Sequence, residues 1–243
     1  AVVAEGDTIE IIDSETYTGS NNYALANNVV KDIIVRAKTG ETPIIDGGGS
    51  AAYFIRFDDN YTFSGLILQN FATGDTGILT HRASEPRVGT LTVTECIFRE
   101  STGQILDLDQ VGTSLTGVTT IERCQFYNNS AALTGDYARQ VGAGVKRVTL
   151  NNCLFYNIGP RNDNFMIVDS RNADTSITHC TFAKRDTTVA NAVQPAKLFQ
   201  IGGGDFKFNL LYEFDASAET ILATTGGDIS YNSYGNDSSV SGS

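Results

Sequence analysis

The sequence predicts an all-β fold, a right-handed single-stranded parallel β-helix of about eight coils, and three observations support this prediction. The composition is rich in Val, Ile, Thr, Phe and Tyr, which favour strands, while Gly and Asn mark the turns. The four cysteines are spaced 28, 29 and 27 residues apart. Each cysteine has an apolar residue three positions before it and a phenylalanine two positions after it.

This frame extends beyond the cysteines. Its copies are Val93-x-x-Cys96-x-Phe98, Ile121-x-x-Cys124-x-Phe126, Leu150-x-x-Cys153-x-Phe155, Ile177-x-x-Cys180-x-Phe182, Phe63-x-x-Leu66-x-Leu68, Val30-x-x-Ile33-x-Val35, Phe206-x-x-Asn209-x-Leu211 and Ile229-x-x-Asn232-x-Tyr234. The last two marked positions share one face of a strand, whereas the first has the opposite parity and is equally apolar. We therefore expect a left-handed bend just before the cysteine position, so that all three side chains face inward.

The inward positions should form ladders from coil to coil. We expect the four cysteines to stack in the interior as free thiols, in preference to disulfides. The absence of a Cys-x-x-Cys pair argues against a zinc site. The four phenylalanines of the same frame should form a stacked aromatic ladder, and Phe126→Ala should cost roughly 3–5 kcal/mol.

A third strand should complete each coil, and its outer face is the predicted site. We expect this strand at residues 53–58, 77–81, 105–109, 165–169 and 198–201, with no clear copy at 131–146. Alternation then turns these residues outward: Arg56, Asp58, Leu79, His81, Asp107, Asp109, Ile167, Asp169 and Arg171. Aligning Thr80 with Phe57 and Leu108 would place His81 between Asp58 and Asp109, an arrangement that favours the imidazolium. The candidate substrate-binding residues are the charged residues and the histidine of this face: Arg56, Asp58, His81, Asp107, Asp109, Asp169 and Arg171.

Charge and hydropathy exclude several classes of protein. Only 17 Lys and Arg stand against 28 Asp and Glu, a net charge of −11, which argues against a nucleic-acid partner. The acidic surface is compatible with calcium or a neutral glycan. No apolar run is long enough to predict a membrane span. Residues 1–235 are expected to form one domain, and 236–243 a polar tail or a linker to a further domain of a larger protein.

The corner residues carry a resemblance to a known family. The Cys/Leu-x-Phe corner, the Asn or Gly before it, and the opening Gly6-Asp7-Thr8-Ile9 resemble the pectin-lyase-like β-helix superfamily. The opening is similar to the first coil of alginate lyases and chondroitinase B. The copies of Cys-x-Phe-Tyr-Asn resemble uncharacterised β-helix domains of polysaccharide-degrading Bacteroidetes. The resemblance covers residues 5–235 and implies a secreted or cell-surface bacterial protein that meets an extracellular polysaccharide.

The known catalytic sets of these lyases are not found here. The sequence lacks the alginate-lyase Asn-Gly-x-Glu-x-x-Arg segment and the pectate-lyase Arg-x-Pro-x-x-Arg motif. Weak catalytic candidates are His81, as the base of a lyase, and Asp107 with Asp109, about 7 Å apart on one strand face, as an inverting pair. Two hypotheses follow: a carbohydrate-binding or lyase-like β-helix, or a non-catalytic structural or adhesive β-helix of a cell surface or fibre.

Overall fold

A computed structural model of the chain describes residues 6–19, 23–24, 32–51, 53–57, 60–74, 77–81, 89–107, 117–129, 139–142, 146–158, 166–170, 174–185, 197–201, 203–212, 220–224 and 227–235. All regular secondary structure in these residues is β-strand. None of them belongs to a helix that is long and apolar enough to cross a membrane. The strands are short because each side of a coil is only a few residues wide.

The strands form three long sheets and one small pair. Sheet A contains β1 (Thr8–Ile11), β4 (Ile33–Ala37), β7 (Tyr61–Ser64), β11 (Thr90–Thr94), β15 (Val118–Glu122), β18 (Arg147–Asn151), β21 (Asp174–Thr178), β24 (Asp205–Lys207) and β27 (Asp228–Ser230). Sheet B contains β2 (Thr16–Thr18), β5 (Ile44–Asp46), β8 (Ile67–Gln69), β12 (Ile97–Arg99), β16 (Gln125–Tyr127), β19 (Leu154–Ile158), β22 (Thr181–Arg185), β25 (Leu210–Tyr212) and β28 (Ser233–Gly235). Sheet C contains β3 (Tyr23–Ala24), β6 (Ile55–Phe57), β10 (Leu79–His81), β14 (Leu106–Asp107), β17 (Arg139–Gly142), β20 (Met166–Ser170), β23 (Lys197–Ile201) and β26 (Thr220–Thr224). The small pair is β9 (Ala72–Gly74) with β13 (Thr102–Gly103).

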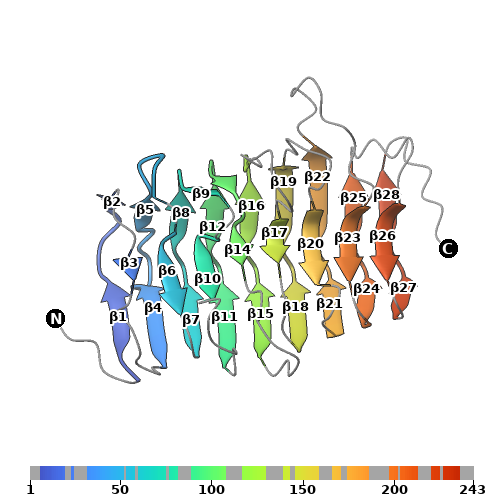
Figure 1. Ribbon diagram of the computed structural model, residues 1–243, viewed down its shortest axis with the longest axis horizontal. Helices are drawn as coiled ribbons and strands as arrows, with labels where there is room; N and C mark the ends of the chain where they lie inside the picture. The colour runs from blue at the N-terminus through green and yellow to red at the C-terminus, as the bar shows by residue number, and fades with distance from the viewer. Residues whose placement is uncertain are drawn as a thin grey trace.

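Within the described residues each coil before the last contributes one strand to each of the three long sheets, and the last contributes β27 and β28. Neighbouring strands pair in parallel, for example β11 with β15 and β12 with β16. Figure 1 shows the coils side by side in chain order, from the N-terminus at one end of the solenoid to the C-terminus at the other. Within the described residues two sheets have nine strands and one has eight. Nine coils therefore contribute strands, whereas about eight coils were expected. The fold is therefore the parallel β-helix class that the repeat predicts.

The predicted bend lies between sheets A and B. The residue before each inward corner residue has a left-handed backbone, and these residues are Gly65, Glu95, Arg123, Asn152, His179, Phe208 and Tyr231, with φ between 52° and 70°. The early copy of the frame at Val30 is wrong, because Ile33 and Val35 lie in β4 and pair with Tyr61 and Phe63. A longer connection separates β4 from β5, so the second coil has no tight corner of this kind.

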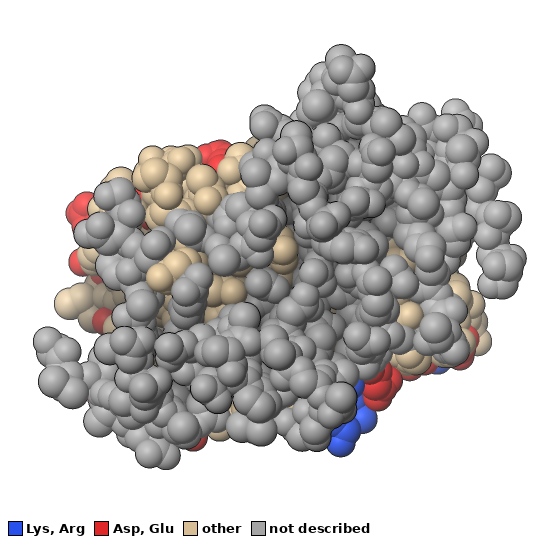
Figure 2. Space-filling view, in the orientation of Figure 1, with Lys and Arg blue, Asp and Glu red and all other residues tan. Residues whose placement is uncertain are grey.

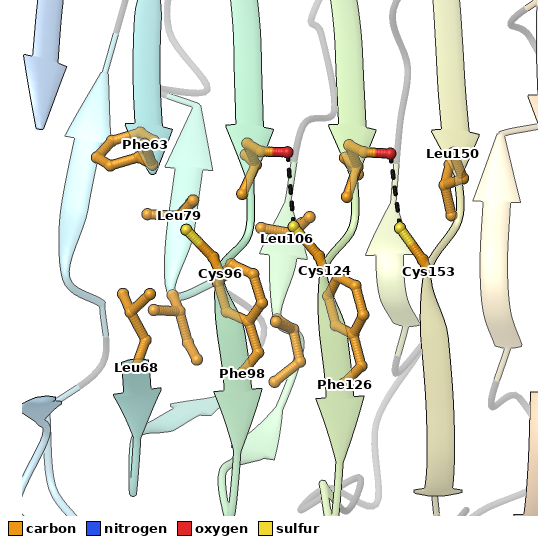
Figure 3. Packing of buried hydrophobic residues seen from close by; sticks show 14 of the residues in the cluster. Phe63, Leu68, Leu79, Cys96, Phe98, Leu106, Cys124, Phe126, Leu150 and Cys153 are labelled. Atoms are coloured by element: carbon orange, nitrogen blue, oxygen red, sulfur yellow. Dashed lines mark hydrogen bonds between the residues drawn. The ribbon is translucent and has the colours of Figure 1, made fainter. Parts of the chain in front are cut away.

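The interior ladders are confirmed. Phe98, Phe126, Phe155 and Phe182 stack with ring centroids 5.0, 4.5 and 4.9 Å apart and planes within 18° of parallel. All four cysteines are buried free thiols. Figure 3 shows the cysteines above the phenylalanines in adjacent coils, with Cys124 and Cys153 each donating to a backbone carbonyl of the preceding coil at 3.5 Å. Burial raises the pKa of Cys96 to about 12, which keeps this thiol protonated.

Asparagine replaces cysteine in the last two corners. The Asn209 side chain accepts a hydrogen bond from the Cys180 backbone N–H and donates one to the Ile177 carbonyl, both at 2.9 Å. Asn232 repeats this pattern one coil later, accepting from the Asn209 N–H at 2.9 Å and donating to the Phe206 carbonyl at 2.8 Å. The amide thus satisfies backbone groups of the coil before it, which explains how a polar side chain is tolerated at a buried position.

Sheet C differs from its sequence-based description in two ways. The coil between Cys124 and Cys153 does have a third strand, β17, whose Val141 pairs with Leu106 and Val168. It was missed because one apolar residue among Arg, Gln and Gly gives no alternation. Leu79 is buried and pairs with Ile55 and Leu106, so its predicted outward orientation is wrong. A bend before the strand turns two consecutive residues inward, as in the buried pair Ile78 and Leu79.

Candidate functional site

The predicted site lies on sheet C, where the backbone places three of its residues at one register position. Thr80 pairs with Arg56 on one side and Asp107 on the other, and Asp107 connects through Gly142 to Asp169. Asp58, Asp109 and Arg171 lie outside the described residues. The substrate-binding role of all these residues stays a prediction.

The predicted histidine cluster is wrong in register. His81 pairs with Phe57, and Thr80 pairs with Arg56, so Thr80 is not aligned with Phe57. His81 therefore has the strand parity of the buried Leu79, two residues before it. It does not lie at the register position that Arg56 and Asp107 share. The error is one residue, and it comes from the two consecutive inward residues at the start of the strand.

Thr80 also limits how open this face is. It shares the position of Arg56 and Asp107, yet only 2% of its surface is exposed. Thr80 itself therefore offers almost no surface to a ligand at the β10 coil.

The outer face of sheet B carries connected polar side chains that are partly exposed. Asp46, Gln69, Arg99 and Tyr127 occupy the same outward position in four consecutive coils, and we call them the polar ladder. Gln69 Nε2 donates to Asp46 Oδ2 at 2.7 Å, and Arg99 Nε donates to Gln69 Oε1 at 2.8 Å. Arg99 Nη1 donates to the Tyr127 hydroxyl at 3.0 Å. The ladder is thus held in one conformation by its own hydrogen bonds.

Asp46 is the anionic end of this ladder. Partial burial acts to raise its pKa, but hydrogen bonds from Gln69, from the Gly48 backbone N–H and from Asn70 outweigh it, so the pKa lies below the usual range. The charge of Arg99, two coils away, acts in the same direction. The ladder therefore presents a fixed carboxylate at one end, a guanidinium in the middle and a phenol at the other end.

The same outward position continues with aromatic residues. Tyr127 pairs with Tyr156, Tyr156 with Ala183, and Ala183 with Tyr212. Tyr156 and Tyr212 are 40% and 39% exposed, so part of each side chain is accessible to solvent. Sheet B thus combines hydrogen-bonding groups and exposed rings along one line parallel to the solenoid axis.

A second aromatic feature lies at the corner between sheets A and B. His179, Phe208 and Tyr231 stack with centroids 5.2 and 5.1 Å apart and planes within 8° of parallel. Phe208 is 50% exposed and Tyr231 is 75% exposed, and both have positive φ. Because each ring covers the face of its neighbour, the stack offers edges along its side and a free face only at its end.

The outer face of sheet A is a weaker candidate for a binding site than sheet B, because its charged side chains form ion pairs with one another. Exposed ion pairs join Arg36 to Glu10, Arg147 to Asp174, and Lys207 to Asp205 and Asp228. Such pairs contribute little to stability and bind no partner by themselves. In Figure 2 the described basic side chains of the visible face are few and do not form a continuous patch.

The described residues contain no group of three or more His, Cys, Asp or Glu side chains that could hold a metal ion. Calcium stays a prediction from the acidic composition.

The sequence contained the signal for the sheet B site. In the repeating frame the residue directly after the inward phenylalanine must face outward, and in consecutive copies it is Arg99, Tyr127 and Tyr156. The site residues predicted from the sequence all lie on the third strand, so they do not include this outward position.

Fold and site together define the class of this protein: a parallel β-solenoid of the β-helix type, with a polar and aromatic outer face on sheet B. No protein-family model matches the sequence, and no curated protein matches it either.

Proposed function

We propose that this β-helix binds an extended extracellular polysaccharide along the outer face of sheet B, without cleaving it. The observation that carries the proposal is the polar ladder, in which the partly exposed Arg99 is hydrogen-bonded to both Gln69 and Tyr127. Side chains already fixed in place lose little conformational entropy when they bind a ligand. The proposal agrees with the resemblance to the pectin-lyase-like superfamily and with a secreted or cell-surface location.

The chemistry of the ladder suits sugar hydroxyls. A hydroxyl both donates and accepts, and the ladder supplies a carboxylate, an amide, a guanidinium and a phenol in sequence. Arg99 uses Nε and Nη1 in the ladder, so three of the five N–H groups of a guanidinium have no partner in the described part of the chain. Those three groups are the donors that a glycan would meet first.

The dimensions suit a linear chain. Coils repeat about every 4.8 Å, which is close to the length of one sugar unit in an extended polysaccharide. Successive sugars would then meet equivalent positions in successive coils, from Asp46 to Tyr127. A branched or globular ligand gains nothing from such a regular array.

The proposal of binding without cleavage follows from the residues of this face. Lyase chemistry needs a base close to the sugar ring and a cation to neutralise the uronate. The polar ladder offers Arg99 as the only cation and no histidine. Cleavage at the sheet C residues, with His81 or the pair Asp107 and Asp109, remains a separate hypothesis.

Affinity gel electrophoresis with neutral and uronate polysaccharides, together with the absorbance of unsaturated products, tests the proposal. We expect retardation by at least one polysaccharide and no product. Arg99→Ala should weaken retardation at least about tenfold, since a hydrogen bond to a charged group contributes about 1.5–3 kcal/mol. Arg147→Ala, which removes the same charge from sheet A, is the matched control and should bind as wild type.

The alternative is a structural or adhesive β-helix without glycan affinity. Absence of retardation by every polysaccharide would favour it. Equal retardation of the Arg99 and Arg147 variants would instead show that the glycan does not bind at the polar ladder. Formation of unsaturated product would instead establish a lyase.

A further inference from the structure

The outward line of residues on sheet B has one small member between two large ones. Tyr156, Ala183 and Tyr212 occupy equivalent positions in three consecutive coils. With a coil spacing of about 4.8 Å, the backbones of the two tyrosines are about 9.6 Å apart. Ala183 has no side-chain atom beyond Cβ, so nothing from its own position fills the interval between the phenol side chains.

Exposed apolar surface gathers around this interval. Nine large hydrophobic side chains of the described residues are exposed, and three of them, Tyr156, Leu210 and Tyr212, surround Ala183. Leu210 lies on the same strand as Tyr212, and Thr181 pairs with it from the strand of Ala183. The described side chains around the interval thus combine apolar surface with the hydroxyls of Thr181, Tyr156 and Tyr212, and none of the five is charged at neutral pH.

We propose that this interval, which we call the Ala183 slot, holds one uncharged sugar ring between Tyr156 and Tyr212. The C–H faces of the ring lie against the phenol rings, and the Thr181 hydroxyl is available to a ring hydroxyl. A ring between two side chains in van der Waals contact is expected to span an interval of about two coils. The inference rests on the proposed function, because it names the ring that one part of the same face selects.

The position of the slot favours a sugar over the side chain of a protein partner. Tyr156 pairs directly with Tyr127, whose hydroxyl accepts from Arg99. A linear glycan on the polar ladder would reach the slot at its next units without changing direction. The polar ladder would therefore hold hydroxyls, and the slot would hold the apolar face of one ring.

Filling the slot tests the inference. Ala183→Tyr restores an unbroken line of tyrosines, and the interior Phe ladder shows that stacked rings suit this coil spacing. Ala183→Ser is the matched control because it leaves the slot open. Unfolding of both variants in urea should show that the fold is retained.

The probes are methyl β-glucopyranoside, methyl β-galactopyranoside and phenol, and the readout is the NMR spectrum of protein with labelled tyrosine. Tyr156→Phe and Tyr212→Phe assign two of the ten tyrosine signals. We expect a glycoside to shift both signals in wild type and in Ala183→Ser, with affinity at least about tenfold weaker in Ala183→Tyr. Absence of these shifts, or shifts that survive in Ala183→Tyr, overturns the slot. Shifts with phenol alone also overturn it and indicate a site for an aromatic side chain.

Polysaccharide retardation separates this inference from the proposed function. Retardation that depends on Arg99 but is unchanged in Ala183→Tyr leaves the function standing and rejects the slot. Glycoside shifts at the slot without any retarded polysaccharide support the slot and reject the extended binding face.

Discussion

The rings of Phe126 and Phe155 stack in adjacent coils with centroids 4.5 Å apart and planes 2° from parallel. Both rings are fully enclosed by neighbouring coils. The coil spacing of a parallel β-helix is close to the stacking distance of two aromatic rings, so one residue type repeated at one position fills the core. The outward position directly after each phenylalanine then forms a second line of residues on the outside.

Phe126→Ala should destabilise the protein by about 3–5 kcal/mol, because the cavity removes contacts with the rings on both sides. The measurement is the free energy of unfolding from urea denaturation. Phe126→Leu keeps most of the volume and should cost clearly less. Equal losses for the two variants would show that the stacked volume is not what stabilises this coil.

Gly204→Ala should be much more harmful than Gly203→Ala. A Cβ at Gly204 would overlap the backbone carbonyl of Thr175 in the preceding coil, and φ at Gly204 is 117°, where only glycine is comfortable. A Cβ at Gly203 meets nothing within 4 Å. We expect Gly204→Ala to lower the melting temperature or prevent folding, and similar melting of the two variants would contradict the close approach.

Asn209→Ala should cost about 1–3 kcal/mol for each buried backbone group that it leaves without a partner, here the Cys180 N–H and the Ile177 carbonyl. Asn209→Cys should be tolerated better, because the Cys180 sulfur already accepts the Cys153 N–H at 3.4 Å in the coil before. The free energies of unfolding of the two variants check this order. If the alanine variant is the more stable one, the asparagine ladder is not a stabilising feature.

Asp46 should titrate below the ordinary aspartate pKa of about 3.9, and Gln69→Ala should move its pKa upward by removing one hydrogen bond. A depressed folded-state pKa contributes stability that is present above the unfolded-state pKa. This stability is lost as the pH falls through the folded-state value. Carboxyl NMR titration measures the pKa of Asp46 in the wild type and in Gln69→Ala. Coincident curves would show that the polar ladder does not hold this carboxylate.

The period near 28 residues was enough to predict the class of fold, the corner and the interior ladders. The left-handed corner at Glu95 and Arg123 followed from parity alone, although neither residue favours that conformation. The buried cysteines followed from the equivalence of Cys96 with Leu66. These inferences succeed because stacking forces every coil to repeat the same inward pattern.

Registers without a strong repeat could not be derived in the same way. The shift of His81 and the inward Leu79 depend on a bend before the strand, which alternation does not encode. The second coil has a longer connection after β4, so its frame was placed one strand too early. Strand β17 has a single large apolar residue, Val141, and only pairing with its neighbours identifies the strand.

The sequence alone determined that this chain stacks into a parallel β-helix, because inward residues of one kind recur at one interval. It also contained every residue of the sheet B face. Only the tertiary structure decided that Gln69, Arg99 and Tyr127, about thirty residues apart in the chain, join by hydrogen bonds. Contacts between side chains of neighbouring coils depend on register to within a single residue, and register is set when the coils pack.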